Sequence, residues 1–152
     1  MSAAFFYDTW AFVALWNGAD AGHAIAAELD ERLDPWRAVT SDYVLDETLT
    51  FLHADAGARV ALAFLGGLED RIAGGDLLLF EVTPPRRERA LATFRKLAPS
   101  IPRLSFTDCT SFVLMRELGI RVAFTADAHF RAAGGGVVPA VERKGRDYRS
   151  TL

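Results

Sequence analysis

Short apolar runs alternate with longer helical stretches along this chain, and this alternation constrains its fold more than any other feature of the sequence. The runs are almost continuously apolar, which is typical of strands that are buried on both faces. Such strands separated by helices are typical of βαβ units. The predicted fold class is therefore α/β, with three layers (α/β/α) around a central, mostly parallel sheet.

The expected elements follow from the same pattern and from the residues that begin and end helices. Ser41 or Asp42 can cap a helix, Ser105 can cap another, and Gly119 ends the latter. We expect strands at residues 3–7, 38–40, 77–82, 120–125 and 137–138, and helices at residues 9–16, 21–33, about 42–53, 56–72, 84–98, 105–118 and 127–133.

The length of 152 residues fits a single domain over residues 1–152, and about half of the residues are apolar. The first residues have no basic segment, and their apolar run is cut by Asp8, so we expect no signal peptide. No apolar run approaches the roughly 20 residues of a membrane helix. The single cysteine, Cys109, excludes an internal disulfide and a zinc cluster. We therefore expect a cytoplasmic protein without membrane association.

Charge gives only a weak indication of the partner. The formal net charge is −3, which argues against binding of nucleic acid through overall charge. Basic residues do gather at 86–89 and at 143–149, and nearly all of them are arginines. We interpret these two clusters as a solvated helix face and a solvated tail rather than as a surface for nucleic acid.

Three aspartates fall where the predicted sheet would bind a ligand. Asp8 ends the first strand, Asp127 follows the strand at 120–125, and Asp108 lies in the first turn of the helix that Ser105 caps. Ligands of parallel α/β sheets bind beyond the carboxyl ends of the strands. We therefore expect these three carboxylates to meet at one edge of the sheet.

Glu47 is the fourth candidate. Its helical neighbours at three and four residues include Val44 and Phe51, which place it on or beside the buried stripe of its helix. The adjacent Asp46 has more polar neighbours and is expected to be solvated. A carboxylate at the position of Glu47 needs a partner, because burial of a single charge is costly.

Each of these four residues also has an ordinary structural explanation, as a helix cap, a dipole partner or half of a salt bridge. Together they point to a metal. Two carboxylates about 4 Å apart repel by about 4 kcal/mol at an effective dielectric constant near 20. A divalent cation removes that repulsion, and a site made of oxygen ligands favours Mg²⁺ or Mn²⁺. Such an ion can activate water for hydrolysis of a phosphodiester.

At these residues the sequence resembles the PIN-domain family, in particular its compact VapC-type toxin ribonucleases. Four motifs in order carry the resemblance, which spans essentially the whole chain: Asp8-Thr9, the helix segment around Glu47, Leu104-Ser-Phe-Thr-Asp108, and Thr125-Ala-Asp127-Ala-His-Phe130. Trp10 and Ala126 depart from the more usual polar residues at their positions.

The resemblance implies a PIN-like domain that hydrolyses RNA endonucleolytically. Asp8, Asp108 and Asp127 would bind one or two Mg²⁺ or Mn²⁺ ions, with Glu47 assisting directly or through water. Thr9 and Thr125 would orient the carboxylates or the scissile phosphate. Family resemblance also implies a homodimer and the toxin role of a type II toxin–antitoxin pair, in which a cognate antitoxin covers the acidic site.

Two alternatives stay open at this point. One is an acid-cluster phosphoryl-transfer domain, although Asp8 lacks a paired aspartate and neither lysine follows a suitable strand. The other is a non-catalytic PIN-like module whose acidic site binds an arginine of a partner. His129 is interpreted as a surface or partly packed histidine, and Cys109 as a small buried hydrophobic residue.

Overall fold

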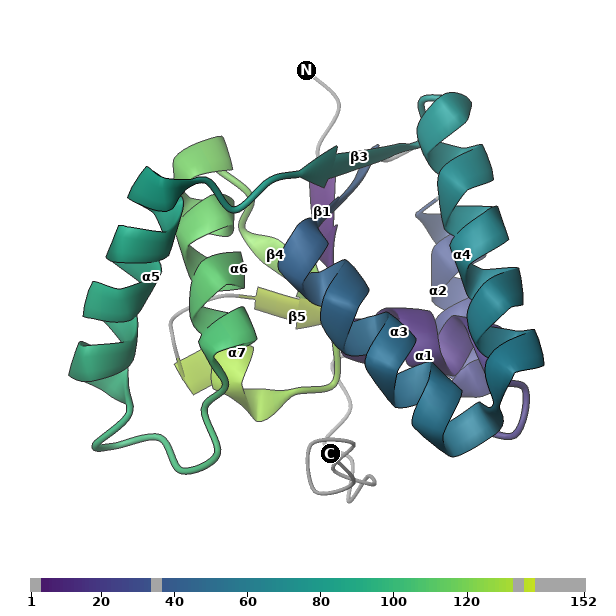
Figure 1. Cartoon of the computed structure of the whole chain (residues 1–152), viewed down its shortest axis with the longest axis horizontal. Helices are drawn as coiled ribbons and strands as arrows, with labels where there is room; N and C mark the ends of the chain where they lie inside the picture. Colours follow the sequence, from purple (N-terminus) through teal and green to yellow (C-terminus); the bar gives the residue numbers. More distant parts are fainter. Residues whose placement is uncertain (1–3, 34–36, 133–135, 139–152) are drawn as a thin grey trace.

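A computed structural model of the chain describes residues 4–33, 37–132 and 136–138. Its strands form one sheet in the order β3-β2-β1-β4-β5, and each neighbouring pair is parallel (Figure 1). The predicted α/β class and parallel sheet are confirmed. The strands are β1 (Ala4–Tyr7), β2 (Arg37–Ser41), β3 (Leu77–Phe80), β4 (Val122–Phe124) and β5 (Gly136–Val138).

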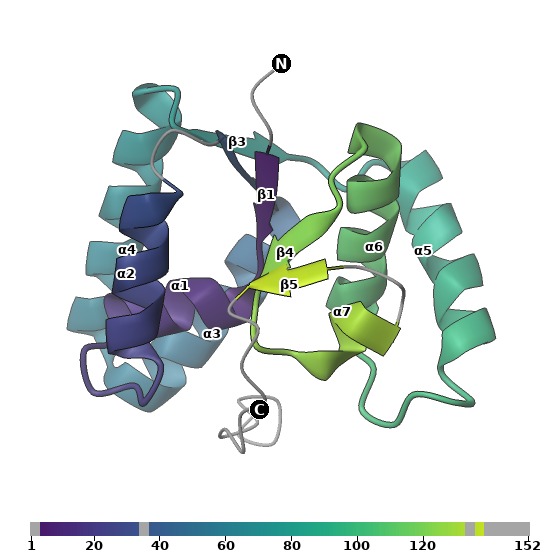
Figure 2. The same ribbon diagram turned by 180° about the vertical axis from the view of Figure 1, so that it is seen from behind.

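Helices flank the sheet on both sides, as the three-layer prediction requires. Figures 1 and 2 show α5, α6 and α7 on one side and α1, α2 and α4 on the other. Helix α3 contacts α1, α4 and α6 and so connects the two groups. The helices are α1 (Thr9–Trp16), α2 (His23–Arg32), α3 (Asp42–Ala56), α4 (Ala58–Ala73), α5 (Pro84–Leu97), α6 (Phe106–Leu118) and α7 (Ala128–Ala132).

Helices α3 and α6 begin and end at the capping residues that the sequence predicts or that glycine provides. The Ser41 hydroxyl accepts a hydrogen bond from the backbone N–H of Val44 at 3.1 Å, which caps α3. Gly57, with φ of 88°, separates α3 from α4 in a conformation that residues with a side chain rarely adopt. Gly119 ends α6 in the left-handed region, with φ of 69°.

Two predicted strands are longer than the observed ones, because backbone groups beyond the strand ends bind elsewhere. The backbone N–H of Val82 donates to the Asp42 carboxylate at 2.9 Å, so β3 ends at Phe80. The N–H of Ile120 donates to the carbonyl of Met115 at 2.8 Å and belongs to the end of α6.

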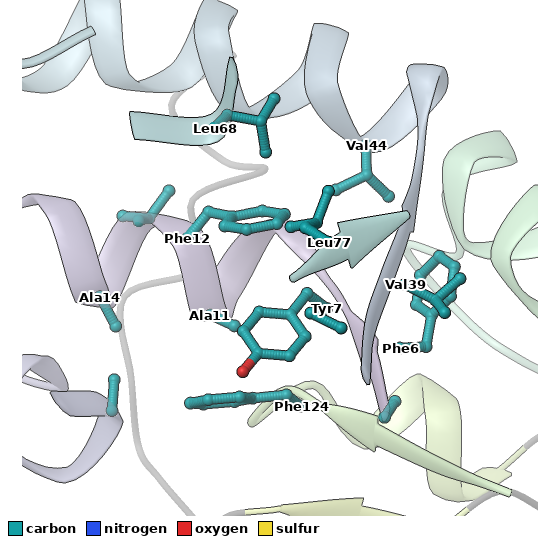
Figure 3. Packing of buried hydrophobic residues seen from close by; sticks show 14 of the residues in the cluster. Phe6, Tyr7, Ala11, Phe12, Ala14, Val39, Val44, Leu68, Leu77 and Phe124 are labelled. Carbon is teal, nitrogen blue, oxygen red and sulfur yellow. The ribbon is translucent and has the colours of Figure 1, made fainter. Parts of the chain in front are cut away.

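Aromatic rings fill the main core around the carboxyl end of β1 (Figure 3). Tyr7 lies between Phe12 of α1 and Phe124 of β4, with ring centroids 5.6 and 5.0 Å away. Phe12 in turn packs against Phe64 of α4 at 5.3 Å. Burial of each such side chain stabilises the fold by about 1.5–3 kcal/mol. This packing fixes the backbone at the end of β1, directly before Asp8.

A smaller cluster, which includes Ala90 and Cys109, holds α5 against α6. Arg86 of α5 forms two hydrogen bonds to the Glu117 carboxylate, at 3.0 and 2.8 Å, and Arg89 lies 3.4 Å from the same group. The interpretation of residues 86–89 as a solvated face is therefore wrong for Arg86, whose side chain is only 17% exposed. The second basic cluster, at 143–149, lies outside the described residues.

Within residues 4–33, 37–132 and 136–138, none of the helices has the length and apolar character needed to cross a lipid bilayer.

Candidate active site

The order of the strands reverses at β1. From β1 the sheet continues through β2 to β3 on one side, whereas β4 and β5 lie on the other side. Ligands of open parallel sheets bind where the strand order reverses in this way. Tyr7 at the end of β1 pairs with Phe124 at the end of β4, so Asp8 and Thr125 leave the sheet next to each other.

Asp8 is fully buried directly after β1. It occupies the N-cap position of α1, yet its side chain makes no capping hydrogen bond to this helix, which the structure describes in full. Instead its carboxylate oxygen Oδ2 accepts a hydrogen bond of 2.8 Å from the hydroxyl of Thr125. The carboxylate of Asp8 thus binds a residue at the end of β4 rather than capping its own helix.

Thr125 connects Asp8 to Asp127. Its hydroxyl donates to Asp8 and at the same time accepts a hydrogen bond of 3.0 Å from the backbone N–H of Asp127. The hydroxyl is fully buried, and both of these bonds fix its orientation. The carboxylate of Asp127 accepts a further hydrogen bond of 2.9 Å from the backbone N–H of His129.

Asp108 reaches the same place from α6. It is 1% exposed and forms a capping box with Ser105: each side chain accepts a hydrogen bond from the other residue's backbone N–H, at 3.2 and 3.0 Å. The helix-capping role that the sequence offers as an ordinary explanation for Asp108 is therefore confirmed. The same carboxylate oxygen, Oδ2, also lies 3.1 Å from Nδ1 of His129, so capping does not account for all of its contacts.

His129 lies between two of the aspartates. Its Nδ1 is 3.1 Å from Asp108 Oδ2 and 3.3 Å from Asp127 Oδ1, and its side chain is 18% exposed. The sequence interpretation of His129 as a surface or partly packed histidine fits this exposure, and the structure adds that its ring nitrogen lies beside two aspartates. The signal that could have identified this proximity is the position of His129 two residues after Asp127, within one short turn.

Glu47 is half-buried on α3, and the adjacent Asp46 is exposed, as the sequence predicts. The T-shaped contact between Tyr43 of α3 and Phe106 of α6, with ring centroids 5.9 Å apart, fixes α3 against the start of the helix that carries Asp108. Glu47 does not belong to the group of mutually close donor atoms described below.

Two buried hydroxyls adjoin these carboxylates in the sequence. Thr9 follows Asp8 and Thr48 follows Glu47, and both residues are fully buried. Neither hydroxyl has a hydrogen-bond partner among the residues that the structure describes. A buried hydroxyl without a partner costs about 1–3 kcal/mol.

The donor atoms themselves fit a cation. Among the described residues, one ligand atom each from Asp108, Asp127 and His129 lie within 4.8 Å of one another. Asp8 lies outside this group of three; the hydroxyl of Thr125 links its carboxylate to the backbone N–H of Asp127. Carboxylate oxygens suit Mg²⁺ and Mn²⁺, and an imidazole nitrogen is compatible with first-row transition metals. The site therefore has the donor chemistry that the acidic motifs predict.

Comparison with known proteins establishes the family. The PIN domain family profile matches residues 5–136, and the chain belongs to the PIN-domain family. The chain is 34% identical over 129 residues to the 23S rRNA-specific endonuclease VapC20 of Mycobacterium tuberculosis, which covers 85% of this chain and 93% of the relative.

Solved structures agree with this assignment. The crystal structure of Mycobacterium tuberculosis VapC20, described as a sarcin–ricin-loop-cleaving toxin, matches with a TM-score of 0.77 and 33% identity and covers 91% of this chain and 98% of that one. VapBC2 from Rickettsia felis, bound to a DNA fragment of its promoter, matches with a TM-score of 0.64 over 88% of this chain and 96% of that one. At 12% identity the second likeness concerns the fold alone.

Proposed function

We propose that this protein is an Mg²⁺- or Mn²⁺-dependent endoribonuclease that hydrolyses phosphodiester bonds of RNA and acts as the toxin of a VapC-type toxin–antitoxin pair. The observation that carries the proposal is the continuous series of contacts from Asp8 through Thr125, Asp127 and His129 to Asp108. These contacts link acidic residues from three separate parts of the fold near the carboxyl ends of β1 and β4.

Each residue of the site would have its own role in binding the ion or in orienting the residues that bind it. Asp8, Asp108 and Asp127 would hold the ion, and Glu47 would assist directly or through water. Thr125 keeps the Asp8 carboxylate oriented through its 2.8 Å hydrogen bond, and Thr9 offers a buried hydroxyl next to it. The ion, when bound, would polarise the scissile phosphate and activate water for attack.

The relative suggests where to look for a substrate. VapC20 is named for cleavage of 23S rRNA and of the sarcin–ricin loop, and it resembles this chain over most of both sequences. We propose a structured loop of ribosomal RNA as the first substrate to test. Looped RNA presents unstacked bases that a protein can bind. A cognate antitoxin, a homodimer and a cytoplasmic location remain predictions.

The decisive experiment is an RNA cleavage assay with the purified protein. We expect endonucleolytic cleavage of ribosomal RNA in Mg²⁺ or Mn²⁺, no cleavage in EDTA, and recovery when the metal is restored. Asp8→Asn and Asp127→Asn should remove cleavage. Absence of cleavage of any RNA by a folded, metal-loaded wild type would favour the non-catalytic module instead.

Adjacent residues on α3 provide a matched control. Glu47→Gln and Asp46→Gln introduce the same amide on neighbouring positions, one half-buried and one exposed. We expect Glu47→Gln to reduce cleavage strongly and Asp46→Gln to leave it unchanged. Equal effects of the two substitutions would contradict a specific role of Glu47.

A further inference from the structure

We propose that His129 is itself a metal ligand, through Nδ1, and that it shifts the preference of the site from Mg²⁺ toward Mn²⁺. This inference rests on the proposed function, because it concerns the same ion. The acidic motifs alone predict a site whose ligand atoms are all oxygens, and this inference adds one nitrogen ligand.

The distances between the donor atoms carry the proposal. Nδ1 of His129 lies 3.1 Å from Asp108 Oδ2 and 3.3 Å from Asp127 Oδ1. An octahedral ion with ligands at about 2.1 Å separates neighbouring ligand atoms by about 3.0 Å. The imidazole nitrogen therefore already lies close to the spacing of adjacent ligands from each carboxylate, and all three donor atoms lie within 4.8 Å of one another.

The backbone holds the ring in this place. His129 N–H donates to Asp127 Oδ1 at 2.9 Å, so the residue is fixed to the carboxylate beside which its ring nitrogen lies. Phe130, the next residue, is buried and packs edge-on against Phe112 of α6, with ring centroids 5.0 Å apart. Helix α7 is thereby anchored to the helix that carries Asp108, and little rearrangement is needed for His129 to bind an ion.

The nitrogen donor has a consequence for metal selectivity. Mg²⁺ prefers oxygen ligands, whereas imidazole suits transition metals, and Mn²⁺ lies at the start of that series. Replacement of one oxygen or water ligand by imidazole should therefore favour Mn²⁺ over Mg²⁺. An ordinary alternative exists: the ring could serve as a counter-ion that the metal displaces.

The two roles predict opposite effects of one substitution. If His129 is a ligand, His129→Leu removes a donor and should weaken Mn²⁺ binding by about tenfold or more, with a smaller loss for Mg²⁺. If His129 is only a counter-ion, the same substitution removes a competitor of the metal. Affinity for both ions should then stay the same or rise, which would overturn the proposal.

A spectroscopic measurement on the wild type tests the ligand directly and does not depend on how a variant folds. Pulsed electron paramagnetic resonance of bound Mn²⁺ should show coupling to a ¹⁴N nucleus. The chain has three histidines, and His53 is exposed at the end of α3, so His53→Leu is the matched control. The coupling should persist in His53→Leu and disappear in His129→Leu.

The outcomes separate this inference from the proposed function. Binding of Mn²⁺ with nitrogen coupling supports the ligand role of His129. Binding that Asp108→Asn weakens, but that shows no nitrogen coupling, overturns this role and leaves the metal-dependent nuclease standing. Failure of the wild type to bind Mn²⁺ or Mg²⁺ at millimolar concentration would overturn both.

Discussion

The hydroxyl of Thr125 donates a 2.8 Å hydrogen bond to the carboxylate of Asp8, although 117 positions of sequence separate the two residues. Both are fully buried, and the bond crosses from the end of β4 to the end of β1. Together with the hydrogen bond from the backbone N–H of Asp8 to the carbonyl of Phe124, it joins the first part of the fold to the last at the site. Its removal should therefore affect both stability and chemistry.

Thr125→Val should lower both the stability of the fold and the nuclease activity. Valine has nearly the same shape but cannot donate to Asp8 or accept from the N–H of Asp127, so both of these hydrogen bonds are lost. We expect a loss of about 1–3 kcal/mol in the free energy of unfolding and a clear fall in kcat/KM. Denaturant unfolding and RNA cleavage assays measure the two effects.

Thr125→Ser is the control for this prediction, because serine keeps the hydroxyl. It should retain most of the cleavage activity. A Thr125→Val protein as active as the wild type would show that the orientation of Asp8 does not depend on this bond.

Asp8→Asn should remove nuclease activity without loss of stability in metal-free buffer. The amide oxygen can still accept from Thr125, while the cost of a buried charge near other carboxylates disappears. Thermal unfolding in EDTA should show an equal or higher Tm than the wild type. A large fall in Tm would mean that Asp8 serves the fold rather than the ion.

Asp108→Asn should behave differently from Asp8→Asn, because Asp108 also stabilises the start of α6. The Asp108 carboxylate accepts from the N–H of Ser105 and lies beside Nδ1 of His129, and its negative charge favours the N-terminus of α6. Its neutralisation should cost about 1 kcal/mol in EDTA. A rise in Tm would show that repulsion among the carboxylates outweighs these contacts.

The sequence could predict features that depend on neighbouring residues, but not those that depend on contacts between distant segments. Residues whose role depends on their immediate neighbours, such as the caps Ser41 and Ser105, were predictable, because capping involves only the next few residues. The placement of Asp8 and Asp127 at strand ends was predictable for the same reason. The parallel sheet of the predicted PIN-like fold is confirmed, but its strand order depends on pairings between distant segments.

Arg86 was misinterpreted for that same physical reason, because its partner, Glu117, lies on another element, α6. The contact of His129 with Asp108 of α6 likewise depends on a distant segment. Local periodicity carries no information on which distant side chains meet. The roles of Asp8, Glu47 and the other candidate site residues stay predictions until variants are tested.

Gly67→Ala should destabilise the protein. A Cβ at Gly67 of α4 would overlap with the indole ring of Trp16, which is half-buried and packs against Phe64 with centroids 6.2 Å apart. Displacement of this ring should cost about 1–3 kcal/mol, more than the helix propensity gained. Gly66→Ala is the control, because nothing lies within 4 Å of its Cβ, and it should be neutral or stabilising. Chemical denaturation compares them.

The ion pair between Arg86 and Glu117 should make a pH-dependent contribution to stability. The hydrogen bonds from Arg86 hold the pKa of Glu117 below its usual value, so the stabilisation is complete above the unfolded-state pKa of about 4.3 and is lost as the pH falls through the lower folded-state pKa. We expect Glu117→Gln to cost at most about 1 kcal/mol at pH 7, because the Glu117 side chain is 36% exposed, and the difference from the wild type should shrink as the pH falls below about 4. Urea unfolding at several pH values measures it, with Glu69→Gln at an exposed position of α4 as the control. A difference that persists unchanged at pH 3 would mean that packing of the side chain, rather than its charge, joins α5 to α6.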